Sequence, residues 1–444
     1  MQARLSRNRL SPFRIIITGF GAVILIGTLL LMLPISAKAR QWTSIENALF
    51  TATSAVCVTG LVVQDTATYW SAFGQAVILV MIQIGGLGIV SVAAFIATIS
   101  GKKVSLLQRS VLQESISAHQ VGGLVKMTAF IFEVAFLIEL IGAVLMFPVF
   151  FKAYGAYGIW MSVFHSVSAF CNAGFDIMGD KTGIFTSLTA FSDQIWIVIP
   201  VCLLIVIGGI GFLTWEDIAE KRFHVKKYRL QSKVVLTTTA VLIVIPAMIL
   251  FFNDFSFFPL KERICLSVFH AITPRTAGFN TIEMSSLTGA GRAMTIALMV
   301  IGGSPGSTAG GLKTTTIAVL IANVVAVIRR RKSTQLFGRR IEDSTIKTAS
   351  TLMIIYLGWI LLGAFMISII DGLPIGVCLF ETASAVGTVG LSYGITPSLG
   401  LISHLILIGL MFFGRVGGLT LMYAALSYTG NEFSQCPVEK INVG

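Results

Sequence analysis

The sequence predicts an all-α membrane protein in which four copies of one structural unit surround a central axis. Three observations support this fold class: long apolar runs, shorter stretches between them, and a glycine-ended motif that occurs four times. Of the 444 residues, 55% are hydrophobic and only 12% are charged, whereas a soluble chain carries about 25% charged residues. This composition is typical of a protein that crosses a membrane several times.

Eight long apolar runs are candidates for membrane crossings, at about 20 residues per crossing. They cover 13–34, 72–100, 125–150, 192–218, 232–252, 289–328, 345–370 and 398–426. No small-residue cleavage site is clear after the first run, so we expect it to be retained as a helix. A shorter stretch lies inside each consecutive pair of runs, and a stretch of this length more often re-enters a membrane than crosses it. These stretches are 45–57, 160–171, 262–273 and 374–386.

Basic residues predict the orientation of the chain in the membrane. They gather at the N-terminus and in the loop after every second run: Arg4, Arg7, Arg9, Arg14; Lys102, Lys103, Arg109, Lys126; Lys221, Arg222, Lys226, Lys227, Arg229, Lys233; Arg329, Arg330, Arg331, Lys332, Arg339, Arg340 and Lys347. Loops rich in Lys and Arg stay in the cytoplasm. We therefore expect a cell (plasma) membrane protein with both termini cytoplasmic. The net charge of +12 does not indicate nucleic-acid binding, because no basic stripe interleaved with aromatics appears.

The four short stretches resemble one another in sequence. They read FTATSAVCVTGL (50–61), FHSVSAFCNAGF (164–175), FHAITPRTAGF (269–279) and FETASAVGTVGL (380–391). The second run of each pair carries a glycine cluster, namely IGGLGI, IGGIGF, IGGSPG or FGRVGG. Four copies in phase indicate an internal repeat. The predicted units are 1–100, 101–218, 219–330 and 331–444, all pointing the same way around a shared pore.

Each short stretch ends in a triplet suited to ion coordination. A cation that leaves water needs its hydration replaced, and rings of backbone carbonyls can do this. Glycine permits the positive φ angles that turn successive carbonyls inward, and the negative end of the preceding short helix also favours a cation. The predicted selectivity filter is Val58, Thr59, Gly60, Asn172, Ala173, Gly174, Thr276, Ala277, Gly278, Thr388, Val389 and Gly390.

Two features beneath this filter predict a gate. In the third unit, small, flexible and polar residues interrupt the second helix. They are Gly302, Gly303, Ser304, Pro305, Gly306, Ser307, Thr308, Ala309, Gly310, Gly311, Leu312 and Lys313. In the fourth unit, Arg415 takes the place of a glycine, where a positive charge would impede cations. For His165, His270 and Glu381 we expect an anchoring role at the short helices, and for Glu133 and Glu139 a structural one.

Two other motifs match parts of the sequence but do not explain the whole chain. Gly302-x-Ser304-x-Gly306 fits the nucleophile pattern of a serine hydrolase, and His404 could pair with Ser304 as in an intramembrane protease. That interpretation leaves the fourfold repeat unexplained. The stretch 306–314 nearly matches a phosphate-binding loop, but Leu312 precedes the lysine and no hydrophobic strand comes before it. We expect no enzymatic activity, and no disulfide or zinc site from the six cysteines, which form no CxxC pair.

Taken together, the four loops resemble the Trk/Ktr/HKT superfamily of potassium transporters and channels, and within it the bacterial KtrB-type membrane subunits. The similarity covers nearly the whole chain. It implies four M1–P-loop–M2 units with filter glycines at Gly60, Gly174, Gly278 and Gly390. It also implies that the loop from Gly302 to Lys313 lies inside the membrane and that Arg415 is the cavity arginine.

The resemblance further implies a K+-translocating homodimer in a lipid bilayer, with one pore per protomer. A cytoplasmic octameric ring of RCK-type subunits would bind ATP or ADP, since no Rossmann-like βαβ segment occurs in this chain. Only the fourth triplet is Thr-Val-Gly and none continues to Tyr-Gly, so we expect fewer stacked ion sites than in tetrameric potassium channels. A sodium- or proton-coupled symporter is the alternative, which the parallel repeats and the lack of paired carboxylates along one path disfavour.

Overall fold

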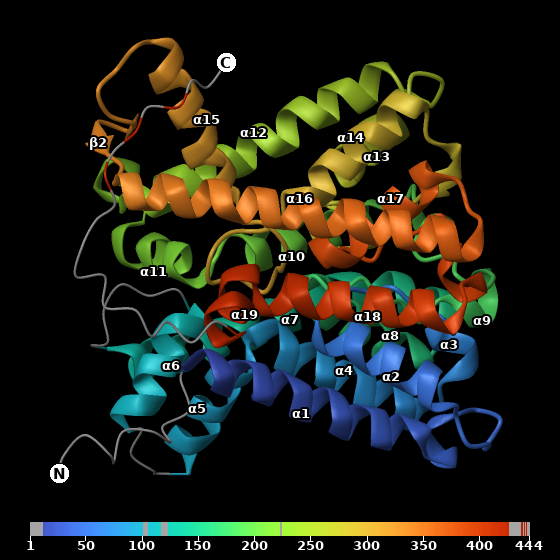
Figure 1. The fold of residues 1–444 in the computed structure, drawn as a ribbon. Helices are drawn as coiled ribbons and strands as arrows, with labels where there is room; N and C mark the ends of the chain where they lie inside the picture. Colours follow the sequence, from blue (N-terminus) through green and yellow to red (C-terminus); the bar gives the residue numbers. More distant parts are fainter. Residues whose placement is uncertain are drawn as a thin grey trace.

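The computed structural model describes residues 12–100, 105–116, 123–222, 224–425, 437, 439 and 441. The basic residues Arg4, Arg7, Arg9, Lys102 and Lys103, as well as Cys436 and the predicted position of both termini, lie outside the described residues. Within this part of the chain nearly all regular structure is helical (Figure 1). One order of elements recurs four times: a long helix, a short helix and a second, interrupted helix.

The four long helices are the first members of the predicted pairs. They are α1 (Pro12–Met32), α7 (Leu124–Tyr154), α12 (Leu230–Phe252) and α16 (Asp343–Asp371), and each is long and apolar enough to cross a membrane. On these helices, side chains such as Leu25, Leu140 and Ile369 are each at least 61% exposed. Helices that are apolar on their outer as well as their inner faces are those of a membrane protein.

The four short stretches also form helices. They are α2 (Ile45–Val56), α8 (Tyr157–Phe170), α13 (Leu260–Ile272) and α17 (Ile375–Gly387). The last turns of all four are buried, as expected for helices that end inside the molecule. Ser44 caps the first of them by accepting a hydrogen bond from the backbone N–H of Asn47 at 3.3 Å.

The second helices differ from the prediction, because all four are interrupted and not only the third. They comprise α4 (Ala72–Leu87) with α5 (Ile89–Ile99), α10 (Ile195–Gly209) with α11 (Phe212–Lys221), α14 (Gly289–Val300) with α15 (Thr314–Ile328), and α18 (Leu401–Val416) with α19 (Gly418–Ala425). The first two pairs bend by 95° and 98°. Gly88, Gly211 and Gly417 stand at the breaks with φ near +90°, outside the helical region.

These interruptions affect the number of membrane crossings. By length and composition, the described residues contain four spanning helices, or up to six if each bent pair counts as one span. The apolar helices α14, α15, α17 and α18 are shorter than a full crossing. The expected eight crossings therefore stay a prediction, since length and composition alone do not reach that number.

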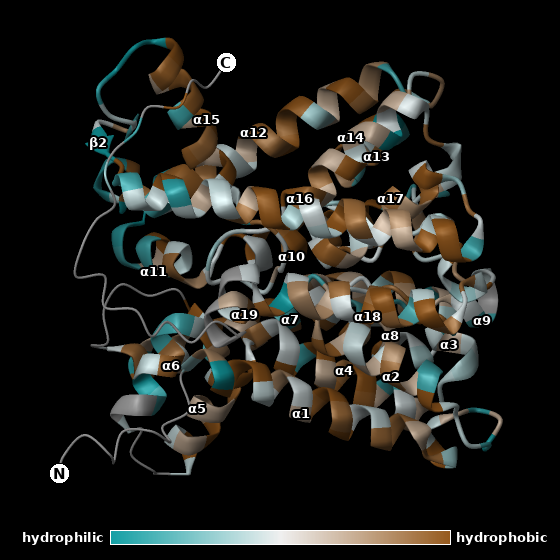
Figure 2. Ribbon diagram, in the orientation of Figure 1, coloured by the Kyte–Doolittle hydropathy of each residue, from teal (hydrophilic) through white to brown (hydrophobic). Residues whose placement is uncertain are grey.

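Short elements occupy the two ends of the helix bundle. Figure 1 places α6 (Leu106–Ile116), α11 and the β1–β2 hairpin (Gln335–Leu336 and Arg339–Arg340) at one end. It places α3 (Thr66–Tyr69) and α9 (Gly179–Thr182) at the other end. Figure 2 shows hydrophilic residues at α6, α11 and β2, and mostly apolar residues along the middle of the helices. The basic loops after the second and third units therefore lie on the same side.

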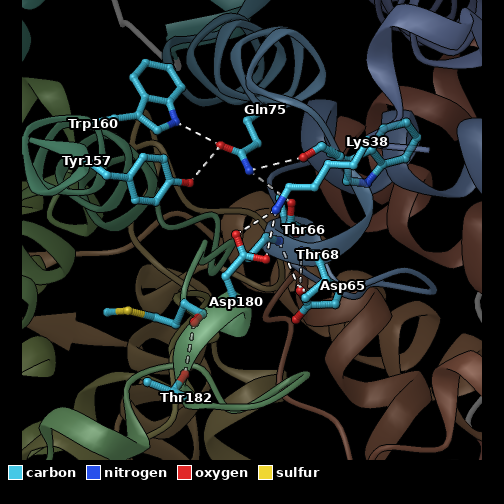
Figure 3. Close-up of polar contacts among 12 residues, drawn as sticks. Lys38, Asp65, Thr66, Thr68, Gln75, Tyr157, Trp160, Asp180 and Thr182 are labelled. Carbon is cyan, nitrogen blue, oxygen red and sulfur yellow. Dashed lines mark hydrogen bonds and ion pairs between the residues drawn. The ribbon is translucent and has the colours of Figure 1, made fainter. Parts of the chain in front are cut away.

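A buried polar cluster joins the first two units at the α3–α9 end (Figure 3). The side-chain oxygen of Gln75, on α4, accepts hydrogen bonds from Trp160 Nε1 at 2.9 Å and from the Tyr157 hydroxyl at 3.3 Å, both on α8. Lys38 pairs with Asp180 across the same end, with 2.6 Å between Nζ and Oδ2. Because Gln75 is only 1% exposed, its hydrogen bonds with Trp160 and Tyr157 satisfy a polar group that would otherwise be costly to bury.

The glycine clusters of the second helices allow close packing against the short helices. A Cβ atom at Gly85 would lie 2.0 Å from the carbonyl oxygen of Val56, and one at Gly208 would lie 2.0 Å from that of Phe170. A Cβ at Gly414 would lie 2.1 Å from the carbonyl oxygen of Val386. These carbonyls belong to the last turns of α2, α8 and α17, so any side chain there would displace the end of a short helix.

Two neighbouring glycines provide a matched test of this packing. Gly208→Ala should destabilise the protein by about 1–3 kcal/mol, the usual cost of overpacking, because its Cβ overlaps Phe170 O. Gly209→Ala should have little effect, since the nearest atom to its Cβ is 3.8 Å away. Thermal unfolding of both variants in detergent measures the difference. Equal unfolding midpoints would show that helix contact at Gly208 does not limit stability.

Candidate functional site

The four predicted filter triplets meet in a closed ring. A Cβ at Gly60 would lie 2.3 Å from the carbonyl oxygen of Ala173, and one at Gly174 would lie 2.5 Å from that of Ala277. A Cβ at Gly278 would lie 2.1 Å from Val389 O, and one at Gly390 would lie 2.3 Å from Thr59 O, which closes the ring. Each glycine thus packs on the middle carbonyl of the next triplet. No other residue fits at these four positions without moving the neighbouring backbone.

The backbone of each triplet has an unusual alternation of φ. The first residues, Val58, Asn172, Thr276 and Thr388, have φ between 50° and 73°, and the glycines have φ between 67° and 95°. The middle residues are outside this left-handed region. Positive φ in a β-branched residue is costly and persists only where the surroundings impose it. Alternating φ turns successive carbonyls to the same side, which is the arrangement a carbonyl-lined ion site requires.

A hydroxyl group braces each triplet from the preceding helix. Ser54 and Ser384 accept hydrogen bonds from the backbone N–H of Gly60 and Gly390 at 3.1 and 3.0 Å. Ser168 donates to Phe175 O at 2.7 Å, and Thr273 donates to Phe279 O at 2.5 Å. Sequence reasoning missed these four residues. The signal was present, because a Ser or Thr occupies the fifth position of every repeated segment.

Above the ring lies a pocket of about 120 Å³ lined by all four filter glycines. Its wall also contains Asp65 and Asp176, which sequence reasoning did not select. Asp65, labelled in Figure 3, accepts hydrogen bonds from the backbone N–H groups of Thr68 at 2.8 Å and Phe185 at 3.0 Å. Two acidic residues therefore line the mouth of the ring.

The predicted gate loop lies directly beneath the ring. Asn172 Nδ2 donates to Thr308 Oγ1 at 2.9 Å. A Cβ at Gly310 would lie 2.2 Å from Thr388 Oγ1, and one at Gly302 would lie 3.2 Å from Thr276 Cγ2. The loop thus touches the first residue of three of the four triplets. In the described chain, Asn172 Oδ1, Thr276 Oγ1 and Thr388 Oγ1 are buried oxygens without a hydrogen-bond partner.

Hydrogen bonds hold the loop to two other second helices, the α10–α11 pair and α18. The N–H of Ser304 donates to Gly209 O at 2.9 Å, and the N–H of Gly311 donates to Gly414 O at 3.2 Å. Gly306 O accepts from the N–H of Phe212 at 2.7 Å. Inside the loop, Lys313 Nζ donates to the carbonyls of Ala309 and Gly310. Among the remaining predicted loop residues, Pro305 and Ser307 lie between these attachment points, whereas Gly303 precedes them and Leu312 follows them.

Arg415 lies below the ring and against the loop. Its Nη1 donates to Thr308 O, and its Nη2 donates to Gly85 O and, at 3.0 Å, to Gly86 O. The carbonyls of Gly85 and Gly86 belong to the C-terminal end of α4, which carries partial negative charge. Arg415 and Lys313 also line a cavity of about 280 Å³ below the loop. The arginine therefore connects three elements of the candidate site.

The discounted protease pair is not formed. Ser304 Oγ lies 2.9 Å from Thr314 Oγ1. His404 Nδ1 lies 2.6 Å from Glu46 Oε1, and its Nε2 lies 2.8 Å from Thr396 O. Both nitrogens of the histidine are thus engaged elsewhere, and the geometry of a nucleophile and its base is not met.

The polar residues near the start of three repeated segments hold the chain that follows each triplet. Glu381 accepts hydrogen bonds from Tyr393 N at 3.1 Å, from Thr396 Oγ1 at 3.2 Å and from Ser392 Oγ. His270 Nε2 lies 3.1 Å from Thr281 Oγ1, and His165 Nε2 lies 3.5 Å from the backbone nitrogen of Ile177. They anchor the short helices to the segments after the filter and contribute no atom to the ring itself.

Arg275 is a residue of the site that sequence reasoning missed. It is 7% exposed, and its best contact is a 3.5 Å hydrogen bond from Nη2 to Thr239 Oγ1. Its Nε has no partner in the described chain. The other segments have Cys57, Cys171 and Gly387 at this position. A guanidinium just after the C-terminal end of α13 offsets the negative end of that helix, so the third segment differs electrostatically from the rest.

Comparisons with known proteins agree with this architecture. The model of the TrkH family, described as cation transport proteins, matches residues 3–433. The potassium/sodium uptake protein NtpJ of Enterococcus hirae is 40% identical over 95% of this chain and 94% of its own length. The Ktr system potassium uptake protein B of Bacillus subtilis is 37% identical over 94% of this chain and 93% of its own.

A solved structure shares the fold at low sequence identity. The potassium transporter TrkH from Vibrio parahaemolyticus superposes with a TM-score of 0.74 at 16% identity, covering 96% of this chain and 87% of that one. Family model, full-length relatives and fold agree over nearly all of the sequence. The chain therefore belongs to the TrkH family of cation transport proteins.

Proposed function

We propose that this chain is the potassium-translocating subunit of a Ktr-type uptake system and conducts K+ down its electrochemical gradient. The closed ring of four glycines, each packed on the middle carbonyl of the next triplet, is the observation that carries this proposal. Repeated carbonyls turned to one side can replace the hydration shell of K+. The name of the Ktr system potassium uptake protein B supports the choice of ion, and the name of NtpJ includes potassium beside sodium.

We further propose that the recurring elements are four M1–P-loop–M2 units with boundaries at 1–100, 101–218, 219–330 and 331–444. The interrupted second helices then complete eight crossings, since irregular backbone at membrane depth is tolerated where protein or water covers it. The loops 221–233 and 329–340 face the cytoplasm of a plasma-membrane protein with both termini inside. Their shared side in Figure 1 supports this orientation.

In this proposal the loop 302–313 and Arg415 form the gate. Three contacts of the loop with the first residues of the triplets support it, because an ion leaving the ring meets the loop next. The transporting form is a homodimer, regulated by a cytoplasmic octameric RCK-type ring that binds ATP or ADP. Relatives named as components of a Ktr system support the existence of a partner.

Flux measurements on the chain alone test the proposed function. In liposomes with an imposed voltage, we expect selective K+ uptake without any sodium or proton gradient. Uptake that needs such a gradient would instead establish a coupled symporter. Absence of K+ uptake, even after the cytoplasmic ring and ATP are added, would refute conduction by this chain.

The filter assignment is tested at Gly278. Gly278→Ser should lower the K+ over Na+ permeability ratio about tenfold, equivalent to about 1.4 kcal/mol, because a Cβ there would lie 2.1 Å from Val389 O at a φ of +83°. Gly376→Ser is the matched control, since no atom lies within 4 Å of its Cβ. If the two variants are equally selective, the ring does not determine selectivity.

The gate assignment is tested at Arg415. Arg415→Ala should raise the K+ flux of the chain alone, because it removes both the positive charge and the contacts with Thr308 and α4. Arg415→Lys keeps the charge but cannot reproduce the bidentate geometry. A leak only in the alanine variant assigns the barrier to the charge. A leak in both variants assigns it to the hydrogen bonds of the guanidinium with Thr308 and α4.

Removal of residues 306–310 should raise the K+ flux as well. Unchanged flux in all variants would place loop and arginine outside the pathway.

A further inference from the structure

A buried carboxylate lies behind the second filter segment. Glu139 is on the long helix α7 and is 5% exposed, whereas Glu133, six residues earlier on the same helix, is exposed. The two glutamates therefore do not form a pair. Burying a carboxylate inside a membrane helix is costly, and such residues more often serve function than stability. Its surroundings therefore indicate what it does.

Gln83 holds the Glu139 side chain. Gln83 Nε2, on α4, lies 2.9 Å from Glu139 Oε1 and 3.2 Å from Oε2. Across the described residues, no Lys, Arg or His lies within salt-bridge distance of Glu139. Ser166, on α8, donates to the main-chain oxygen of Glu139 at 2.5 Å and so attaches the same turn of α7 to the short helix. The carboxylate is thus fixed between α4 and α8.

The other end of the Gln83 amide leads to the filter. Its Oε1 accepts a hydrogen bond from Cys171 Sγ at 3.6 Å. Cys171 caps the C-terminal end of α8 and immediately precedes Asn172, the first residue of the second triplet. Gly86, one turn beyond Gln83, packs on the same thiol, since a Cβ there would lie 2.6 Å from Cys171 Sγ. Helix α4 therefore holds the thiol from two sides.

From Asn172 the contacts continue into the loop. Asn172 Nδ2 donates to Thr308 Oγ1, and Thr308 O accepts from Arg415. Thr308 Oγ1 also donates to Phe170 O at 3.1 Å, which ties the loop back to the end of α8. Polar contacts thus lead from Glu139 to Cys171 and from Asn172 to the loop, and the peptide bond between Cys171 and Asn172 joins the two parts.

This polar series is specific to the second segment and is not a general feature of the repeat. The residues that correspond to Gln83 in the other second helices are Val206, Val300 and Phe412. Asn172 likewise is the only amide at the first triplet position, where the other copies have Val58, Thr276 and Thr388. At the Gln83 position apolar residues suffice for helix packing in the second, third and fourth units, so the polar residue that the first unit places against the second filter segment indicates a further role.

We propose that Glu139 is a positioning residue that acts through Gln83 and Cys171. It sets the orientation of Asn172 and so keeps the second filter triplet in register with Thr308 of the loop. The inference rests on the proposed function of this ring as an ion filter. Glu139 touches no permeating ion, and its effect on ions passes through the thiol and the amide.

One test measures ion selectivity in proteoliposomes. Glu139→Leu and Cys171→Ala should each lower the K+ over Na+ permeability ratio by at least about fivefold, the lower end of the range for coupled sites. The double variant should lose no more than either single variant, because both remove the same connection. Glu139→Gln and Cys171→Ser, which keep hydrogen-bonding groups, should stay close to the parent protein. Glu133→Gln is the control on the same helix.

A second test does not depend on transport. In a full-length chain whose other cysteines, Cys57, Cys202, Cys265, Cys378 and Cys436, are alanine, N-ethylmaleimide can modify only Cys171. Glu139→Leu should increase the modification rate at least about fivefold, whereas Glu133→Gln and Glu139→Gln should not. A thermal unfolding midpoint equal to that of the parent excludes general loosening as the cause.

The outcomes separate this inference from the proposed function. Faster modification of Cys171 in a protein that conducts no K+ would refute the proposed function and leave the positioning contacts intact. Normal K+ conduction, with neither selectivity nor modification rate altered by Glu139→Leu, would overturn the positioning role. A lower unfolding midpoint with unchanged selectivity and labelling would assign Glu139 to stability alone.

Discussion

The contact on which the site depends is the approach of each filter glycine to the middle carbonyl of the next triplet. Four such contacts, at 2.1 to 2.5 Å from the position of an absent Cβ, close the ring. They require positive φ at the glycines and impose it on β-branched neighbours such as Val58 and Thr388. The hydroxyl braces and the close packing of Gly85, Gly208 and Gly414 against the ends of the short helices hold this backbone in place. These surrounding contacts hold the ring in its strained backbone conformation.

The sequence predicted much of this arrangement because the repeat is visible both in the apolar runs and in the glycine-ended motifs. The apolar runs located the four long helices, and the phase of the glycines located all four triplets and the loop beneath them. The breaks at Gly88, Gly211 and Gly417 were not predicted, since a glycine within an apolar run is compatible with either a helix or a bend. Arg275 was missed as well. It contacts Thr239, which is distant in sequence, and only the folded chain shows that, among the described residues, no carboxylate pairs with it.

The four units share one backbone plan but differ in the polar groups behind each triplet. Cys171 and Glu139 lie behind the second triplet with Gln83 of the first unit, Arg275 precedes the third triplet, and the fourth unit supplies Arg415. A tetramer of identical chains cannot carry such differences. A single chain with four unequal units can place one loop beneath the ring and attach it through different contacts to each neighbour.

Arg275, Arg415 and Glu139 are ionisable side chains that are difficult to explain as contributions to stability. Burying such a group costs free energy, yet Arg275 and Glu139 are only 7% and 5% exposed, and Arg415 lines the cavity below the loop. Arg415 is satisfied by helix-end carbonyls and the loop, so its charge stays close to the ring without a carboxylate to cancel it. Glu139 is held away from the ring and reaches it only through hydrogen bonds. In the proposed function, positive charge beneath the ring and acidic residues above it favour entry of a cation from the side of Asp65 and Asp176 and oppose its exit on the side of Arg415.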